Sequence, residues 1–289
     1  MSPLDLLLSP IVRYPLIIAV LVGLTAPVVG TYLVQKRLSL LGDGLGHVAL
    51  TGVAIGWLAS SIFQLSSSDA LAIPGALAAS VIGAVLIEYV REVGHTSRDT
   101  ALAILFYGGI AGGVVIIQLA GGTSQSLMAY LFGSLATVTH SDLWVALALA
   151  LVILLVGVGA RPLLFAVTSD EEHARAIGLP VRAVNVVIAI MAALTVTLAM
   201  RIVGALMVSA LMIVPVAAAQ QVVRGFTRTM RVSMLLGVVC AVSGLLLTVY
   251  VDLPPGGVIV LIAIGFYILG VLAQAGIGRA RISHEPKGT

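Results

Sequence analysis

Nine long stretches of this chain contain no Asp, Glu, Lys or Arg. A helix that crosses the hydrocarbon core of a membrane needs about 20 mostly apolar residues. A membrane β-strand would instead alternate apolar and polar residues, and these stretches are continuously apolar. The sequence therefore predicts an all-α, polytopic membrane protein with about eight or nine transmembrane helices. The charge-free stretches are residues 14–35, 44–68, 70–87, 100–141, 143–160, 183–200, 202–223, 232–251 and 253–278.

The composition excludes an ordinary soluble domain, because 60% of the 289 residues are hydrophobic and only 9% are charged. Polar connections are short, so residues 1–289 are expected to form one transmembrane domain. The formal charge of +3 is expected to come from loops and not from binding nucleic acid. The chain contains no Gly-x-x-x-x-Gly-Lys-Ser/Thr phosphate loop, which indicates that it does not hydrolyse ATP itself. Any energy source would have to be a partner or an ion gradient.

Basic residues are grouped in the connections between the apolar stretches. Cytoplasmic loops of membrane proteins carry an excess of Lys and Arg, so these groups are expected to be cytoplasmic. The C-terminus would then be cytoplasmic, and the N-terminus would lie outside with nine spans or inside with eight. Arg201 violates this rule. The groups lie at residues 36–37, 91–98, 161–182, 224–231 and 279–287.

Asp43 and His47 stand four residues apart at the start of the second apolar stretch. Residues at this spacing share one face of a helix, so a carboxylate oxygen and an imidazole nitrogen could bind the same ion. This mixed ligand pair suits a borderline divalent cation such as zinc or manganese. A second interpretation stays open, in which Asp43 is a helix N-cap and His47 is a buried histidine bonded to a carbonyl group.

Residues 169–180 form a charged connection on the predicted cytoplasmic side. Asp170 can cap a short helix whose first turn contains Glu171 and Glu172, and Gly178 with Pro180 would end it. The pattern predicts a short surface helix, which either binds a cytoplasmic partner or is a solvated loop helix without one.

Other polar residues receive structural interpretations. Glu88 and Arg91 are at the spacing of a helical ion pair. His140 and Asp142 flank an outward turn, and Asp252 is expected in a turn or at a helix end. Three methionines are expected to pack, and the sequence does not decide whether any of them joins an ion pathway; they are Met200, Met207 and Met212.

Three segments of the chain resemble the permease subunits of the zinc and manganese uptake ABC transporters, the ABC-3 type. The segment 36–54, which contains Gly-Asp-Gly-Leu-Gly-His at 42–47, is similar to the family's signature, and segments 203–215 and 252–257 follow in the expected order. Two positions depart from the family pattern. Thr51 stands where proline is usual, and Pro-Gly-Gly at 255–257 replaces Ser-Gly-Pro.

The resemblance implies a type II-like ABC importer permease in a prokaryotic plasma membrane. It implies a homodimer, two cytoplasmic ATP-binding subunits and an extracytoplasmic metal-binding protein. Asp43 and His47 would belong to the path of Zn²⁺, Mn²⁺ or Fe²⁺, with no permanently bound cofactor. The ATP-binding subunits would dock on a short coupling helix that includes Asp170, Glu171, Glu172, Ala174, Arg175, Ala176 and Gly178.

Two other classes of protein remain as alternatives. A gradient-driven secondary transporter would use Asp43 and His47 as a proton relay and would be expected to carry an internal inverted repeat, which the sequence does not display. An intramembrane metalloprotease would need a His-Glu-x-x-His motif or a comparable ligand set, and none is present.

Overall fold

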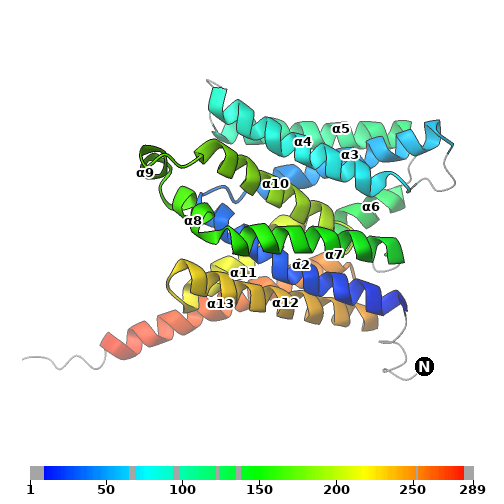
Figure 1. Cartoon of the computed structure of the whole chain (residues 1–289). Helices are drawn as coiled ribbons and strands as arrows, with labels where there is room; N and C mark the ends of the chain where they lie inside the picture. The colour runs from blue at the N-terminus through cyan, green and yellow to red at the C-terminus, as the bar shows by residue number, and fades with distance from the viewer. Residues whose placement is uncertain are drawn as a thin grey trace, which may run out of the picture.

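The computed structural model describes residues 10–64, 69–93, 98–121, 124–134, 138–251 and 253–282. Within these ranges the chain is helical and contains no β-strand, which confirms the predicted fold class (Figure 1). Its elements are α2 (Pro10–Gln35), α3 (Leu41–Ile62), α4 (Ala72–Val93), α5 (Arg98–Leu119), α6 (Ser124–Phe132), α7 (His140–Leu154), the π-helical turn η1 (Leu155–Gly159), α8 (Arg161–Ser169), α9 (Glu171–Ala176), α10 (Val181–Ala199), α11 (Val208–Val222), α12 (Phe226–Tyr250) and α13 (Pro255–Ile282).

Eight of the described helices are long and apolar enough to cross a membrane, in agreement with the predicted eight or nine. The charge-free stretch 202–223 divides into two parts. Residues 202–207 are non-helical, and Gly204 has a φ of 85° that favours glycine. The remainder forms α11, which has 15 residues. At 1.5 Å per residue this helix is about 22 Å long, shorter than the hydrocarbon core.

The non-helical segment before α11 finds backbone partners on α6 and just after it. The Ala205 N–H donates to the Tyr130 carbonyl at 2.9 Å, and the Leu206 N–H donates to the Leu131 carbonyl at 3.2 Å. The Ser134 N–H donates to the Arg201 carbonyl at 3.0 Å. Irregular backbone at membrane depth is tolerated only when protein or water satisfies it, and here α6 supplies the partners.

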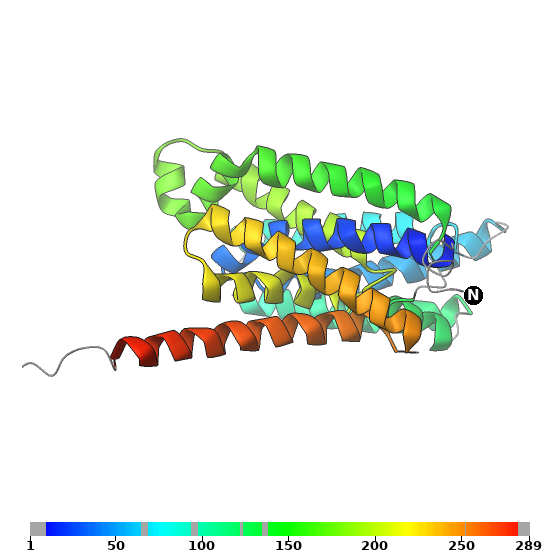
Figure 2. The ribbon, with the colours of Figure 1, turned by 90° about the horizontal axis from the view of Figure 1, so that it is seen from below.

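The two ends of the helical bundle differ in charge. Figures 1 and 2 show the start of α2 at one end, and α8, α9 and the last turns of α13 at the other. We call these the α6 end and the α9 end. Within the described ranges, the eight long helices and α11 make nine passes through the bundle. The predicted basic groups that lie in described helices gather at the α9 end, whereas Arg201 lies at the α6 end.

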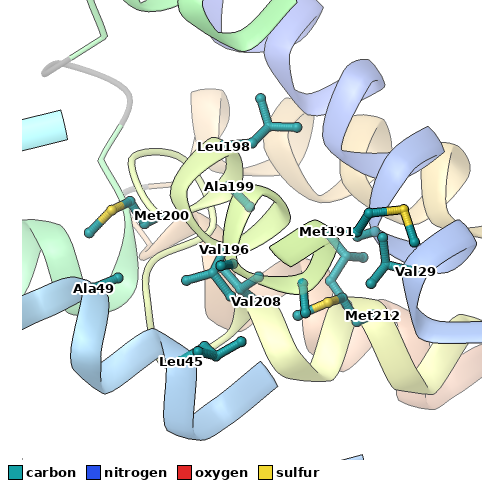
Figure 3. Close-up of a cluster of buried hydrophobic side chains, with 14 of the residues drawn as sticks. Val29, Leu45, Ala49, Met191, Val196, Leu198, Ala199, Met200, Val208 and Met212 are labelled. Atoms are coloured by element: carbon teal, nitrogen blue, oxygen red, sulfur yellow. The ribbon is translucent and has the colours of Figure 1, made fainter. Parts of the chain in front are cut away.

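Helix α2 is central and most of it is buried, with α3 and α10 also largely inside the bundle. Side chains of α3, α10 and α11 interlock around Leu45, Val196 and Met212 (Figure 3). Met200 and Met212 are fully buried in this cluster, which is the packing role predicted for them. Helices α4 and α5 expose most of their apolar surface, as segments in contact with lipid or another subunit do.

Candidate functional site

Asp43 lies in the first turn of α3 and does not cap the helix. The N-cap residue is Leu40, which makes no side-chain capping bond, and α3 begins at Leu41. The interpretation of Asp43 as an N-cap is therefore wrong. A carboxylate in the first turn is stabilised by the positive end of the helix dipole. Asp43 therefore lies at the positive end of the α3 dipole.

One neighbour of Asp43 comes from α11. The Ser209 hydroxyl donates to Asp43 Oδ1 at 3.4 Å. The approach of this segment to α3 requires glycine, because a Cβ atom on Gly46 would lie 2.6 Å from the Ala205 carbonyl oxygen. Gly46 thus faces the segment leading into α11, and Gly42 faces Ser209 and Met212 of α11 itself.

His47 is 5% exposed and lies against α5. Its ring meets the Phe106 ring edge to face, with centroids 4.4 Å apart and planes at 78°. A Cβ atom on Gly109 would lie 2.8 Å from the carbonyl carbon of His47, so α5 can pack this closely against α3 only because residue 109 is glycine. Nδ1 of His47 is buried and has no hydrogen-bond partner among the described residues.

This unbonded nitrogen bears on the second interpretation of His47. A buried histidine with only a structural role is expected to bond its polar atoms to protein groups, because an unsatisfied buried polar atom costs about 1–3 kcal/mol. The structure provides no carbonyl group for Nδ1. The orphaned nitrogen fits a group that receives a transient ligand.

Asp43 and His47 contact two different neighbours of α3. Asp43 contacts Ser209 of α11, and His47 contacts Phe106 of α5. Within the described ranges no group of three His, Cys, Asp or Glu side chains could enclose a metal ion. A structural zinc site uses four protein ligands, so an ion held by these two would keep open coordination positions. Their role as metal ligands stays a prediction.

Thr51 joins the site to α5. Its hydroxyl lies 2.6 Å from the Gly109 carbonyl oxygen and 3.3 Å from the His47 carbonyl oxygen, one turn back on its own helix. At the position where the resembled family has proline, this chain therefore has a polar contact between α3 and α5. The contact lies next to the packing of Gly109 against His47.

The predicted short helix is present as α9. Asp170 is its N-cap and accepts from the His173 N–H at 2.9 Å, and Gly178, with a φ of 81°, follows its end. Ala174 is fully buried and anchors the helix to the bundle. Five of the predicted docking residues are exposed, and their neighbours His173 and Ile177 are exposed as well. The five are Asp170, Glu172, Arg175, Ala176 and Gly178.

Glu171 is partly buried and contacts two residues that the sequence analysis did not pair with it, Lys36 and Asn185. Nζ of Lys36 lies 2.6 Å from Glu171 Oε1. Nδ2 of Asn185, on α10, donates to the same oxygen at 3.3 Å, and Lys36 also donates to Asn185 Oδ1. Burial acts to raise the pKa of Glu171, but the hydrogen bond and charge of Lys36 outweigh it and lower that pKa.

A second polar cluster lies at the α6 end, around Arg201. The Arg201 guanidinium pairs with Asp69, and its Nη1 lies 3.2 Å from Asp142 Oδ2. Asp69 also accepts from the Tyr130 hydroxyl and, at 3.0 Å, from Nε1 of Trp57. The cluster joins α3, α6, α7 and the end of α10, so Arg201 is a buried ion-pair centre.

Asp142 has a different environment from the outward turn predicted for it. It is 8% exposed and forms a capping box with Thr139 at the start of α7. Sequence reasoning missed this role, although Thr139 three residues before an acidic residue is a capping signal. The predicted pair of Glu88 and Arg91 is confirmed as a salt bridge. Asp252 lies outside the described residues.

Comparisons with known proteins agree over nearly the whole chain. The family model described as "ABC 3 transport family" matches residues 9–274. The manganese transport system membrane protein MntC of Halalkalibacterium halodurans is 32% identical over 87% of this chain and 83% of its own length. The chelated iron transport system membrane protein YfeD of Yersinia pestis is 29% identical over 91% and 85%.

A solved structure has the same arrangement of helices. It is titled PsaBC from Streptococcus pneumoniae in complex with Fab, and the matched chain is 28% identical to this one. The match has a TM-score of 0.80 and covers 92% of this chain and 93% of that chain. The fold described above is therefore shared with a solved protein along almost its full length.

Proposed function

This chain belongs to the ABC 3 transport family, and from that premise we propose that it is the permease subunit of an ATP-driven importer of divalent transition-metal ions. Its relatives carry manganese and chelated iron in their names. Manganese is the first ion to test, followed by Fe²⁺ and Zn²⁺. The chain itself is not an enzyme in this proposal, because ATP is hydrolysed by a separate subunit.

The buried, unbonded Nδ1 of His47 is the observation that carries the proposal. Asp43 lies one turn earlier on α3 and supplies a negative charge that the helix N-terminus stabilises. A metal ion bound here would gain one carboxylate oxygen and one imidazole nitrogen in exchange for part of its water shell. Ligands must be deprotonated to bind, so affinity would fall in acid.

Incomplete coordination suits transport. An ion that is held by two protein ligands keeps exchangeable positions, so it can leave as well as enter. The Ser209 hydroxyl lies beside Asp43 and could exchange with water as the seam between α3 and α11 opens. Metal would cross in steps in which this seam faces first one side of the membrane and then the other.

Alternating access of this kind needs partners at both ends of the bundle. Two copies of the permease would form a homodimer, and two cytoplasmic ATP-binding subunits would dock on α9. An extracytoplasmic metal-binding protein would deliver the ion at the α6 end. The exposed surface of α9 and the basic residues around it support the α9 end as the cytoplasmic one.

The test combines transport with direct binding. Vesicles would contain this chain with its ATP-binding subunit and binding protein, and Mn²⁺ uptake would be measured with and without ATP. Purified permease complex, without the binding protein, would be titrated with Mn²⁺. We expect His47→Ala to lose both uptake and binding while the complex remains assembled.

His140→Ala is the matched control for metal binding, because this exposed histidine lies at the α6 end against Tyr14 and Trp144. It should bind Mn²⁺ as the unchanged chain does. Normal uptake by His47→Ala would contradict the assigned pathway. Uptake that is driven by a proton or sodium gradient without any ATP-binding subunit would replace the proposal with the secondary transporter.

A further inference from the structure

Lys36 connects three elements at the α9 end. It follows the last residue of α2, and its side chain is 5% exposed. Its ammonium group bonds to Glu171 on α9 and to Asn185 on α10. A lysine placed there only to orient the chain in the membrane would point into water. Lys36 instead points inward and is held by two partners.

A second ion pair extends this cluster to α4. Glu88 and Arg91 pair with side chains that are 9% and 8% exposed. The charges of both act on Lys36, and the charge of Arg91 also acts on Glu171. A cavity of about 480 Å³ lies between α4, α9 and α10, lined in part by these residues. On the side that faces α4 and α10, α9 is therefore held by polar bonds and borders this cavity, so it has room to shift.

The same lysine stands next to the start of the metal-site helix. The chain turns sharply after it, with a φ of 58° at Arg37, and the Leu38 N–H donates to the Leu33 carbonyl at 2.8 Å. The Leu41 N–H then donates to the Leu38 carbonyl at 3.0 Å, where α3 begins. Asp43 follows two residues later. The connection from Lys36 to Asp43 is therefore short and contains backbone hydrogen bonds at both of its ends.

We propose that Lys36 is a positioning residue that couples α9 to the metal site. When the ATP-binding subunits move α9, the bond from Glu171 to Lys36 moves the turn between α2 and α3, and with it Asp43 relative to Ser209. Asn185 bonds to both residues, so α10 moves together with Lys36 and Glu171. The proposal rests on the proposed function, since it assumes that α9 receives the ATP-binding subunit and that Asp43 binds the ion.

The measurement that tests this role is the amount of Mn²⁺ imported per ATP hydrolysed. A smaller amount of intact complex lowers uptake and ATP hydrolysis together and leaves their ratio unchanged, whereas loss of coupling within assembled complexes lowers the ratio. Lys36→Met keeps the side-chain length and removes the bonds. We expect the ratio to fall roughly tenfold, within the range of coupling between distant sites. Binding of Mn²⁺ without ATP should be unchanged.

Three further variants sharpen the result. Lys36→Arg keeps the charge and the donors and should retain most of the ratio. Arg37→Gln changes the neighbouring exposed cation and should match the unchanged chain. Because Lys36→Met leaves Glu171 as an uncompensated partly buried charge, the double variant Lys36→Met with Glu171→Gln removes both charges and protects folding. It should assemble and still show the reduced ratio.

The outcomes separate the two proposals. A wild-type ratio in the assembled double variant would overturn the role of Lys36 and leave the proposed function intact. An equal fall in Lys36→Met and Arg37→Gln would also overturn it, since the effect would then belong to basic charge in general. Failure of the unchanged chain to import Mn²⁺ with ATP would instead overturn the proposed function.

Discussion

Replacing Arg201 with methionine should destabilise the chain strongly, because it removes the cation from a buried cluster of two carboxylates. Asp142 has a side chain that is only 9% exposed, and Arg201→Met would leave it without that cation. Breaking a buried ion pair on one side costs about 3–5 kcal/mol. Asp69 is 38% exposed, so water compensates much of its loss and it adds at most about 1 kcal/mol.

The expected loss is therefore about 3–5 kcal/mol, and most of it arises at Asp142. At about 2–4 °C per kcal/mol, the unfolding midpoint should fall by about 6–20 °C. Thermal unfolding of the purified chain in detergent micelles measures this shift. Arg13→Met is the matched control, since Arg13 is an exposed arginine at the same end of the bundle and should change stability by less than about 0.5 kcal/mol.

A double-mutant cycle identifies the carboxylate that matters. Arg201→Met combined with Asp142→Asn removes both charges, so it should be more stable than Arg201→Met alone. If Arg201→Met stays within about 1 kcal/mol of the unchanged chain, the buried ion pair does not stabilise this fold and the reasoning fails. The reasoning also fails if Asp142→Asn destabilises the Arg201→Met chain as much as it destabilises the unchanged chain, because the two side chains would then not interact.

Two further predictions concern the two ends of the proposed coupling. Gly109→Ala places a Cβ atom 2.8 Å from the His47 backbone and should cost about 1–3 kcal/mol and reduce Mn²⁺ uptake, whereas Gly108→Ala has open space and should be neutral in the same melting and uptake assays. The pKa of Glu171 in the folded chain is lower than its unfolded value of 4.5. The bond to Lys36 therefore contributes its full stability above pH 4.5, and this stability is lost as the pH falls through the folded pKa. The protection factors of the α9 amides against hydrogen exchange should therefore stay constant from neutral pH to about pH 5 and fall only below it, and a fall near neutral pH would contradict this sign.

Much of the fold follows from local features of the sequence. Charge-free stretches locate the spans, because an ionised side chain is costly in the hydrocarbon core. Asp43 and His47 share a face of α3 simply because they are four residues apart on a helix. The cap at Asp170 and the end of α9 at Gly178 depend on neighbouring residues and were also predictable.

The features that sequence reasoning missed depend on distant partners. Lys36 and Glu171 are separated by more than a hundred positions, and nothing near either residue indicates the other. Arg201 was recognised as an exception to the charge rule, but its partner Asp69 lies 132 positions away. Such pairs are fixed by the packing of helices, which a single sequence does not reveal.

The division of the apolar stretch 202–223 was also missed by sequence reasoning. Residues 202–223 are long and apolar enough for a full span, yet only Val208–Val222 is helical. Gly204 with its positive φ and the backbone bonds to α6 make the non-helical part possible. Hydropathy records how apolar a stretch is, and it does not record which backbone groups another segment can satisfy.

The short α11 has a consequence for how the chain is made. A helix of 15 residues is too short to enter a bilayer stably by itself, and the turns before it would bring unsatisfied amide groups into lipid. The partner that satisfies them, α6, is synthesised about seventy residues earlier, and α12 follows α11 after only three residues. During biosynthesis, α11 would therefore enter the bilayer only after α12 has been synthesised. The turns before α11 would at that point form their hydrogen bonds with α6, which is already inserted. Slow release at this step would make the second half of the chain the part most dependent on membrane chaperones.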